Sequence, residues 1–84
     1  MYLRLEKIDP ARNLWRWYVL SVQSTLFGEW TLSREWGRIG EGSGQTASTI
    51  FSNEREALTA CDALKVSKTR RGYITQPEQL ALPL

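Results

Sequence analysis

Trp36, Gly37 and Arg38 place a flat aromatic side chain, a position without a side chain and a guanidinium within three consecutive residues. An Arg side chain presents a planar fork of hydrogen-bond donors that fits phosphate oxygens, and a Trp side chain presents a plane for stacking. A glycine lets another group approach the backbone closely. Together, these three residue types predict a surface suited to a sugar-phosphate chain.

The neighbouring residues predict that this tripeptide lies at the end of a β-strand. The preceding segment alternates, and one of its faces carries Trp30, Leu32, Arg34 and Trp36. The following segment, 41–45, contains two glycines and is typical of a turn. Side chains at strand ends reach solvent more readily than those in the middle of a sheet, so we expect the motif to be accessible.

Four strands and one helix account for most of the chain. Alternation predicts strands over residues 2–8, 13–23, 27–36 and 45–51. Apolar residues at helical spacing predict a helix from Asn53 to about Thr69, with Gly72 as the stop. We therefore expect an α+β fold in which an antiparallel sheet of about four strands carries one helix across one face. The tail, 76–84, is expected to form a fifth short edge strand or an extended arm.

The length of 84 residues allows one hydrophobic core and not two. We expect a single domain over residues 1–84, with its core over 2–74 and a C-terminal arm over 75–84. The strand over 13–23 is apolar on both faces, which predicts a central position in the sheet. Gly28 is interpreted as a bulge near the start of the next strand.

The helix has a predicted cap and a predicted inner face. Asn53 can accept a backbone hydrogen bond, and Glu56 can reach back to complete a capping box. The inner stripe is expected to contain Ala57, Cys61 and Leu64, with Leu58 and Ala60 beside them.

A cluster of cations without an intervening acid marks the end of the helix. Its members are Lys65, Lys68, Arg70 and Arg71. One reading is a solvated helix end, where cations suit the helix dipole. The other reading is a patch that faces phosphates, which requires it to lie near Arg38. The net charge of +2 and a pI near 9.0 permit an anionic partner without demanding one.

Catalysis, metal binding and cofactor binding find little support in the sequence. The chain has no His, and its single Cys61 is expected to be a small core residue. Glu35 and Glu41 flank the motif, but a carboxylate pair alone is interpreted as part of a solvated turn. We therefore expect no catalytic residues, no metal and no cofactor. Neither a signal peptide nor a membrane-length apolar run is recognised, so cytoplasmic residence is expected, in association with the nucleoid if the protein binds DNA.

The segment Trp36-Gly37-Arg38-Ile39-Gly40 resembles the signature of the WGR domain, a module of DNA-damage-sensing poly(ADP-ribose) polymerases and of short bacterial proteins. The resemblance covers most of the chain, because an aromatic strand precedes the motif and a strand, a helix and a basic segment follow it. In the polymerases the signature Trp packs against the sugar at a DNA end, and the signature Arg lies near the phosphates. The resemblance implies these roles for Trp36 and Arg38, with Gly37 between them.

Further residues are weaker candidates for DNA contact: Asn13, Arg16 and Arg34. Asn13 and Arg16 stand where the polymerase domains also have polar residues. Tyr73 is interpreted as a structural side chain. Later basic and aromatic positions of the polymerase domain have no counterpart in 76–84, so the resemblance implies general backbone contact and leaves recognition of DNA ends open.

These observations lead to one main hypothesis and one alternative. The main hypothesis is a non-catalytic module that contacts DNA through its sugar-phosphate backbone, at ends or breaks or along the duplex, with little sequence specificity. The alternative is a protein-interaction adaptor that docks on a separately encoded partner or forms a homodimer. Neither a membrane nor a small-molecule substrate is expected as a partner.

Overall fold

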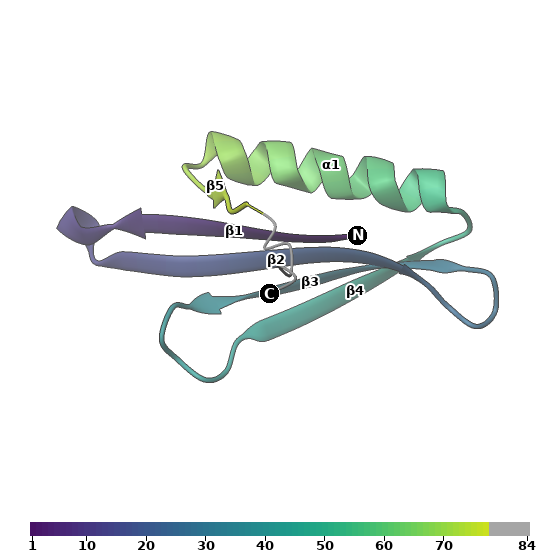
Figure 1. Cartoon of the computed structure of the whole chain (residues 1–84), viewed down its shortest axis with the longest axis horizontal. Coiled ribbons are helices and arrows are strands. Elements are labelled where there is room, and N and C mark those ends of the chain that lie inside the picture. The colour runs from purple at the N-terminus through teal and green to yellow at the C-terminus, as the bar shows by residue number, and fades with distance from the viewer. Residues whose placement is uncertain (78–84) are drawn as a thin grey trace, which may run out of the picture.

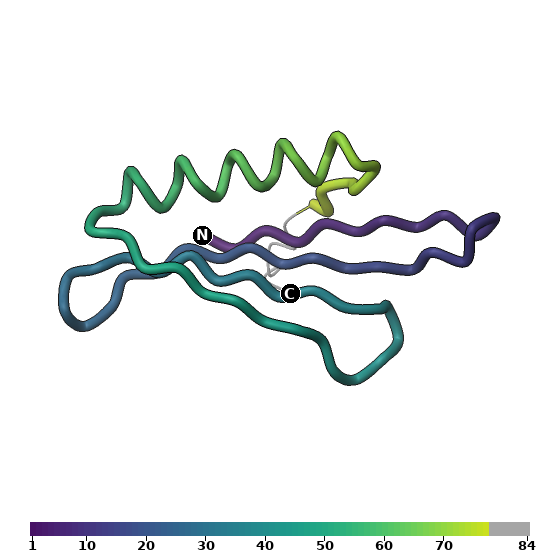
Figure 2. The backbone as a smooth tube through the Cα atoms, turned by 180° about the vertical axis from the view of Figure 1, so that it is seen from behind, coloured from purple at the N-terminus to yellow at the C-terminus, as the bar shows by residue number. Residues whose placement is uncertain are grey.

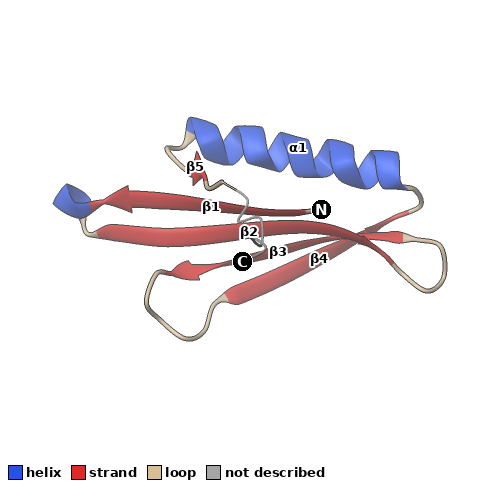
Figure 3. Ribbon diagram, in the orientation of Figure 1, coloured by secondary structure: helices blue, strands red, loops and turns tan. Residues whose placement is uncertain are grey.

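The computed structural model describes residues 1–77, in which five strands form one antiparallel sheet under a single long helix (Figures 1 and 3). The strand order is β4-β3-β2-β1-β5, so β2 is central, as its two apolar faces predicted. The elements in chain order are β1 (Tyr2–Asp9), the 3-10 helix η1 (Pro10–Arg12), β2 (Leu14–Ser24), β3 (Trp30–Arg38), β4 (Gln45–Phe51), α1 (Glu54–Arg70) and β5 (Ile74–Thr75). The α+β fold predicted from the sequence is confirmed, including a fifth short edge strand.

That edge strand forms earlier in the chain than the sequence suggested. The expected segment was 76–84, whereas β5 occupies Ile74–Thr75 and pairs with β1 opposite Leu5 and Glu6. The backbone N–H of Gln76 then donates to the carbonyl of Arg4 at 2.8 Å. The remainder of the expected arm, 78–84, lies outside the described residues.

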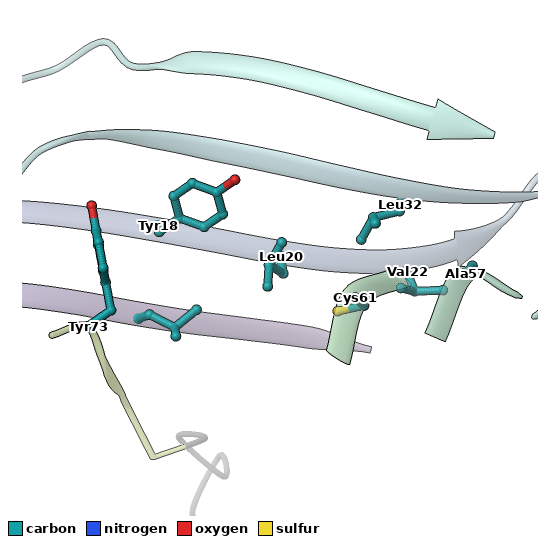
Figure 4. Close-up of a cluster of buried hydrophobic side chains, with 8 residues drawn as sticks. Tyr18, Leu20, Val22, Leu32, Ala57, Cys61 and Tyr73 are labelled. Carbon is teal, nitrogen blue, oxygen red and sulfur yellow. The ribbon is translucent and has the colours of Figure 1, made fainter. Parts of the chain in front are cut away.

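One face of the sheet and the inner face of α1 enclose the core (Figure 4). Directly opposed residues of antiparallel strands point to the same face, and the register opposes Leu5 with Tyr18 and Val22 with Leu32. The buried cluster contains Leu5, Tyr18, Leu20, Val22, Leu32, Ala57, Cys61 and Tyr73. The predicted helix stripe is confirmed for Ala57 and Cys61, but Leu58 is 37% exposed at its margin.

The helix begins and ends where local chemistry favours it. The Asn53 side chain accepts the backbone N–H of Glu56 at 2.9 Å, as predicted for the cap. The return bond of a capping box is replaced, because the Glu56 carboxylate accepts a hydrogen bond from the Ser52 hydroxyl at 3.3 Å. The helix continues one residue past the predicted end, and Gly72 follows with a φ of +98°, which suits glycine.

The third strand begins later than predicted, at Trp30 and not at Phe27. Residues 25–29 form a turn, closed by a hydrogen bond from the Thr25 N–H to the Glu29 carbonyl at 2.8 Å. The Thr25 hydroxyl accepts the N–H groups of Phe27 and Glu29, each at 3.2 Å. Gly28, expected as a bulge, lies in this turn with a φ of +80°. The turn is therefore held by one threonine.

The sheet has two distinct ends. The β2–β3 turn lies at one end, whereas η1, the β3–β4 connection and the C-terminus of α1 lie toward the other (Figure 2). Residues that are distant in sequence are thus brought to one place. The Trp36 motif lies at this second end.

Candidate nucleic-acid interface

A pocket of about 500 Å³ opens on the helix-covered face at this end of the sheet. Strand register forms its floor, since Tyr18 lies opposite Trp36 and Arg16 lies opposite Arg38. The end of α1 contributes Lys68 to its wall. The complete lining is Arg16, Trp17, Tyr18, Arg34, Trp36, Gly37, Arg38, Lys68 and Tyr73. Four cations and four aromatic residues line the pocket, and no acidic residue of the described chain does.

Trp36 is a half-buried side chain at the edge of the core. Its ring is stacked with that of Tyr18, with centroids 5.8 Å apart and planes 14° apart. The guanidinium carbon of Arg34 lies 5.8 Å from the Trp36 ring centroid. Tyr73 meets Tyr18 edge-on at 6.1 Å, which explains why Tyr73 is 8% exposed. The indole is thus packed from two sides, as a core residue would be, and it also lines the pocket, as a binding residue would.

Lys68 lies over the aromatic floor of the pocket. Its Nζ is 4.4 Å from the Tyr18 ring centroid and 5.6 Å from that of Tyr73. Burial lowers the pKa of the Lys68 ammonium, and three nearby cations lower it further: Arg71, Arg34 and Arg16. The charges of these four groups add up to a positive electrostatic potential where Lys68 enters the pocket.

Arg38 is held at the pocket mouth by the turn that precedes β2. Its Nη2 donates to the Asn13 side-chain oxygen at 3.2 Å, and its Nη1 donates to the Asn13 carbonyl at 3.4 Å. Asn13 adopts a left-handed conformation with a φ of 55°, which aims both oxygens at the guanidinium. The Nε of Arg38 lies 3.9 Å from a Glu41 carboxylate oxygen, and both side chains are exposed, so this ion pair is weak.

A row of three cations crosses the sheet beside the pocket. Lys7 of β1 lies opposite Arg16 of β2, and Arg16 lies opposite Arg38 of β3. Like charges at directly opposed positions destabilise a sheet. A bound anion would relieve this repulsion. Lys7 is a functional candidate that sequence reasoning missed, because only the β1–β2 register aligns it with Arg16.

The glycine of the motif serves packing on the other face of the sheet. A Cβ on Gly37 would lie 3.1 Å from Cζ2 and Nε1 of Trp17. A Cβ on Gly44 would lie 2.8 Å from the same Cζ2 and against the carbonyl oxygen of Trp36. A Cβ at position 44 would therefore collide with the backbone, and a Cβ at position 37 would require Trp17 to shift by a few tenths of an ångström. Trp17 packs closely on both segments and holds the 39–44 connection against the strand. Gly37 thus contributes to the motif by allowing Trp17 to pack closely against the strand.

The structure brings together some of the predicted site residues and separates others. Gathered in or beside the pocket are Trp36, Gly37, Arg38, Lys68, Arg71, Arg16 and Arg34, with Asn13 behind Arg38. Lys65 instead lines a hollow with Met1 and Leu3 on the β1 side of the helix. Arg70 shares a second surface hollow with Lys65, Val66 and Thr69. The basic segment is therefore split by helical periodicity.

Tyr18 is a pocket residue that the sequence analysis treated only as part of a strand face. Its signal was present, because alternation places Tyr18 and Arg16 on the same face of β2. What the sequence did not provide was the pairing of Tyr18 with Trp36. The Tyr18 ring in the floor of the pocket and the Trp36 ring of the motif are therefore stacked on each other.

Metal binding, a reactive thiol and a membrane-spanning helix were also considered for the described residues. Residues 1–77 contain no group of three or more His, Cys, Asp or Glu side chains placed to hold a metal. Cys61 is fully buried, and burial raises the pKa of its thiol, with Asp62 raising it further. Within the same residues, no helix has both the length and the apolar character needed to cross a membrane.

Comparison with known proteins gives one relative and one family. The uncharacterized protein y4dW of Sinorhizobium fredii is 40% identical over 75 residues, which is 89% of this chain and 36% of that protein. The chain thus spans about a third of the length of this relative. No solved structure matches the chain. The family model of the WGR domain matches residues 1–79, and WGR domains are nucleic-acid-binding modules. This chain belongs to the WGR domain family.

Proposed function

We propose that this domain binds DNA through its sugar-phosphate backbone, without catalysis and with little sequence specificity. The phosphates would meet the cations at the pocket, and a sugar would pack against the exposed part of Trp36. Neither a recognition helix nor a base-reading set of side chains is part of the proposed surface. Preference for ends or breaks is a finer property that the experiment below addresses.

One observation supports this proposal above all others. Four cations from three elements converge on one pocket, and a tryptophan lines the same pocket: Arg16, Arg34, Arg38, Lys68 and Trp36. Cations that repel each other are costly to gather unless an anion neutralises them. Arginine forks suit phosphate oxygens, and a tryptophan plane suits a sugar or base. A chain of phosphates joined by sugars satisfies both requirements.

The non-catalytic part of the proposal follows from the chemistry that lines the pocket. Its side chains are cationic or aromatic, without a carboxylate or a thiol. The sequence has no histidine, which is the commonest general base. Cations and aromatic rings suffice for binding and positioning.

The first experiment is a fluorescence anisotropy titration of labelled blunt, nicked and closed circular DNA at two salt concentrations. Phosphate contacts release counterions, so the affinity should fall steeply as salt rises. Similar affinities for the three forms would indicate contact along the duplex, and tighter binding of blunt or nicked DNA would place the contact at ends or breaks. Failure of all three to bind at low salt contradicts the proposal.

A substitution of Trp36 tests its share in binding. Because Trp36 packs against the core and Tyr18, Trp36→Ala would remove structural contacts as well as a binding surface. Trp36→Leu keeps much of the apolar volume and removes the plane. We expect it to weaken DNA binding about tenfold, consistent with the loss of one stacking contact. The control is Trp30→Leu, which makes the same change in a half-buried core residue at the opposite end of β3.

A further inference from the structure

The outer edge of β4 is an open strand edge. The strand order places β4 at one end of the sheet, and within residues 1–77 no strand pairs with its outer side. At the other end, β1 is paired with β5 and contains charged residues such as Arg4, Glu6 and Lys7. Charged side chains and short covering strands are devices that prevent edge pairing. Only the β1 end of the sheet has them.

The register identifies the backbone groups that β4 leaves free. The N–H of Ile39 donates to the carbonyl of Trp15 at 2.8 Å, which makes this a hydrogen-bonded pair. Hydrogen-bonded and non-hydrogen-bonded pairs alternate along an antiparallel ladder, so the even-numbered residues of β3 bond to β4. Their hydrogen-bonded partners are the odd-numbered residues of β4. The N–H and C=O groups of Thr46, Ser48 and Ile50 therefore point outward.

The side chains of β4 favour pairing with another strand. Its sequence, Gln45-Thr46-Ala47-Ser48-Thr49-Ile50-Phe51, contains no charged residue and no proline. Thr, Ile and Phe are strong strand formers, and the Ile50 side chain is 60% exposed. Beside the strand, an apolar hollow of about 460 Å³ runs along α1 and includes Phe51, Ala60 and Ala63. The strand edge itself thus carries no charge, while its flank combines this apolar surface with one residue of each sign, Arg55 and Glu56.

We propose that β4 pairs with β4 of a second copy of this chain, in a two-fold symmetric, antiparallel ladder centred on Ser48. Ser48 then lies opposite Ser48 of the second copy, and Thr46 lies opposite Ile50 of the second copy. Each of these is a hydrogen-bonded position, because the outward groups belong to these three residues. The same register opposes Gln45 with Phe51 and Ala47 with Thr49. No like charges meet, which is the condition for a self-complementary edge.

This arrangement determines where the two pockets lie. A two-fold axis perpendicular to the sheet keeps both α1 helices on the same face of one continuous sheet. Both Trp36 pockets open on that face, so they lie on the same side of the dimer. Neither pocket is covered by the ladder, because none of the pocket-lining residues belongs to β4. The dimer therefore neither requires nor blocks DNA binding, and its failure would leave the proposed function intact.

The test uses opposite charges at the symmetry axis. Sedimentation velocity over a range of concentrations should show the 9.7 kDa chain converting to a species of twice that mass. Ser48→Lys and Ser48→Glu each place like charges opposite one another and should weaken dimerisation about fivefold. Mixed in equal amounts, the two variants should form a heterodimer at least as stable as the native dimer, because the pair is then complementary.

Controls separate this outcome from a general effect of charge or misfolding. Ser24→Lys makes the same substitution at an exposed position of β2 and should leave dimerisation unchanged. Circular dichroism should show native folding for all variants, because the Ser48 side chain is exposed. A native chain that remains monomeric at every concentration overturns the proposal. So does a mixture of the two Ser48 variants that fails to dimerise more strongly than either alone.

Discussion

Arg16 and Arg38 lie directly opposite one another on β2 and β3, with no partner of opposite charge between them. Lys7 extends this row across β1, and among residues 1–77 Arg38 is the one member of the row that forms an ion pair, with Glu41 at 3.9 Å. Such a row lowers the stability of the unliganded sheet. Binding of an anion would account for this unfavourable row. Removal of one of its charges should therefore raise the free energy of unfolding and lower the affinity for DNA.

Removal of the central charge tests this opposition. Arg16→Gln should raise the free energy of unfolding by roughly 0.2–1 kcal/mol, because two like-charge pairs are lost. The same substitution should weaken DNA binding. Urea denaturation measures the first effect and anisotropy the second. If Arg16→Gln lowers stability, Arg16 is a structural residue and not part of a binding row.

The ionisation of Lys68 should depend on what occupies the pocket. Burial and the neighbouring arginines lower its pKa in the free domain, and bound phosphates should raise it again. DNA affinity should therefore decline as the pH rises through the pKa of the free protein. Nuclear magnetic resonance titration of the Lys68 Cε signal, with and without DNA, measures the shift. Identical pKa values in the two states would remove Lys68 from the interface.

The effect of pH on folding stability through Lys68 is opposite to that of a lysine whose pKa is raised by folding. Because the pKa of Lys68 is lower in the folded than in the unfolded chain, the unfolded chain holds more protons between this lowered value and the ordinary value of about 10.4. Stability contributed by this group should rise with pH across that window and be flat below it. The difference in unfolding free energy between the native chain and Lys68→Met, followed with pH, should show this rise.

The connection between β3 and β4 contains a matched pair of glycines. A methyl group on Gly44 would collide with Trp17 and with the carbonyl of Trp36, whereas a methyl group on Gly42 meets nothing within 4 Å. Gly44→Ala should destabilise the domain by about 1–3 kcal/mol, which is typical of overpacking. Gly42→Ala should change the stability little. Equal effects in thermal unfolding would refute the role assigned to Trp17.

The β2–β3 turn should tolerate polar substitution. Leu26 is fully exposed and Phe27 is 88% exposed, although both are apolar. Leu26→Ser and Phe27→Ser should each change the unfolding free energy by less than about 0.5 kcal/mol, as expected for surface positions. Leu32→Ala is the contrast, since Leu32 is 3% exposed and such a truncation costs about 2–5 kcal/mol. Destabilisation by the Ser substitutions would show that the tip packs in solution.

Periodicity predicted four of the strands, the helix and the buried face of the helix, but not every boundary. The strand over 45–51 and the cap at Asn53 occur as predicted, because alternation and capping are local properties. The start of β3 was misplaced, because Phe27 continues the apolar pattern although the Thr25 hydroxyl holds it in a turn. The start of β3 therefore depends on hydrogen bonds to one side chain, that of Thr25, which the hydrophobic pattern does not reveal.

The candidate site was only partly predictable, because it depends on register. Trp36 and Arg38 followed from the motif, and alternation allowed Arg34 to be included. The neighbours that complete the pocket come from pairings between distant segments, such as Tyr18 with Trp36 and Lys7 with Arg16. Helical periodicity then separated Lys68 from Arg70, which lie close in sequence. The predicted inner stripe of Ala57, Cys61 and Leu64 continues at helical spacing to Lys68 and not to Arg70, so periodicity alone could have distinguished these two cations.

The most direct test compares two variants with the same loss of charge. Arg34→Gln with Lys68→Gln removes two cations from the pocket, and Arg55→Gln with Lys65→Gln removes two cations that lie elsewhere on α1. If the pocket binds the DNA backbone, the first variant should lose about 10- to 100-fold in affinity, and the slope of log affinity against log salt should fall by about 2. The second should stay within about twofold of the native domain. Equal losses in the two variants would mean that binding depends only on net charge, and would contradict the assignment of this pocket.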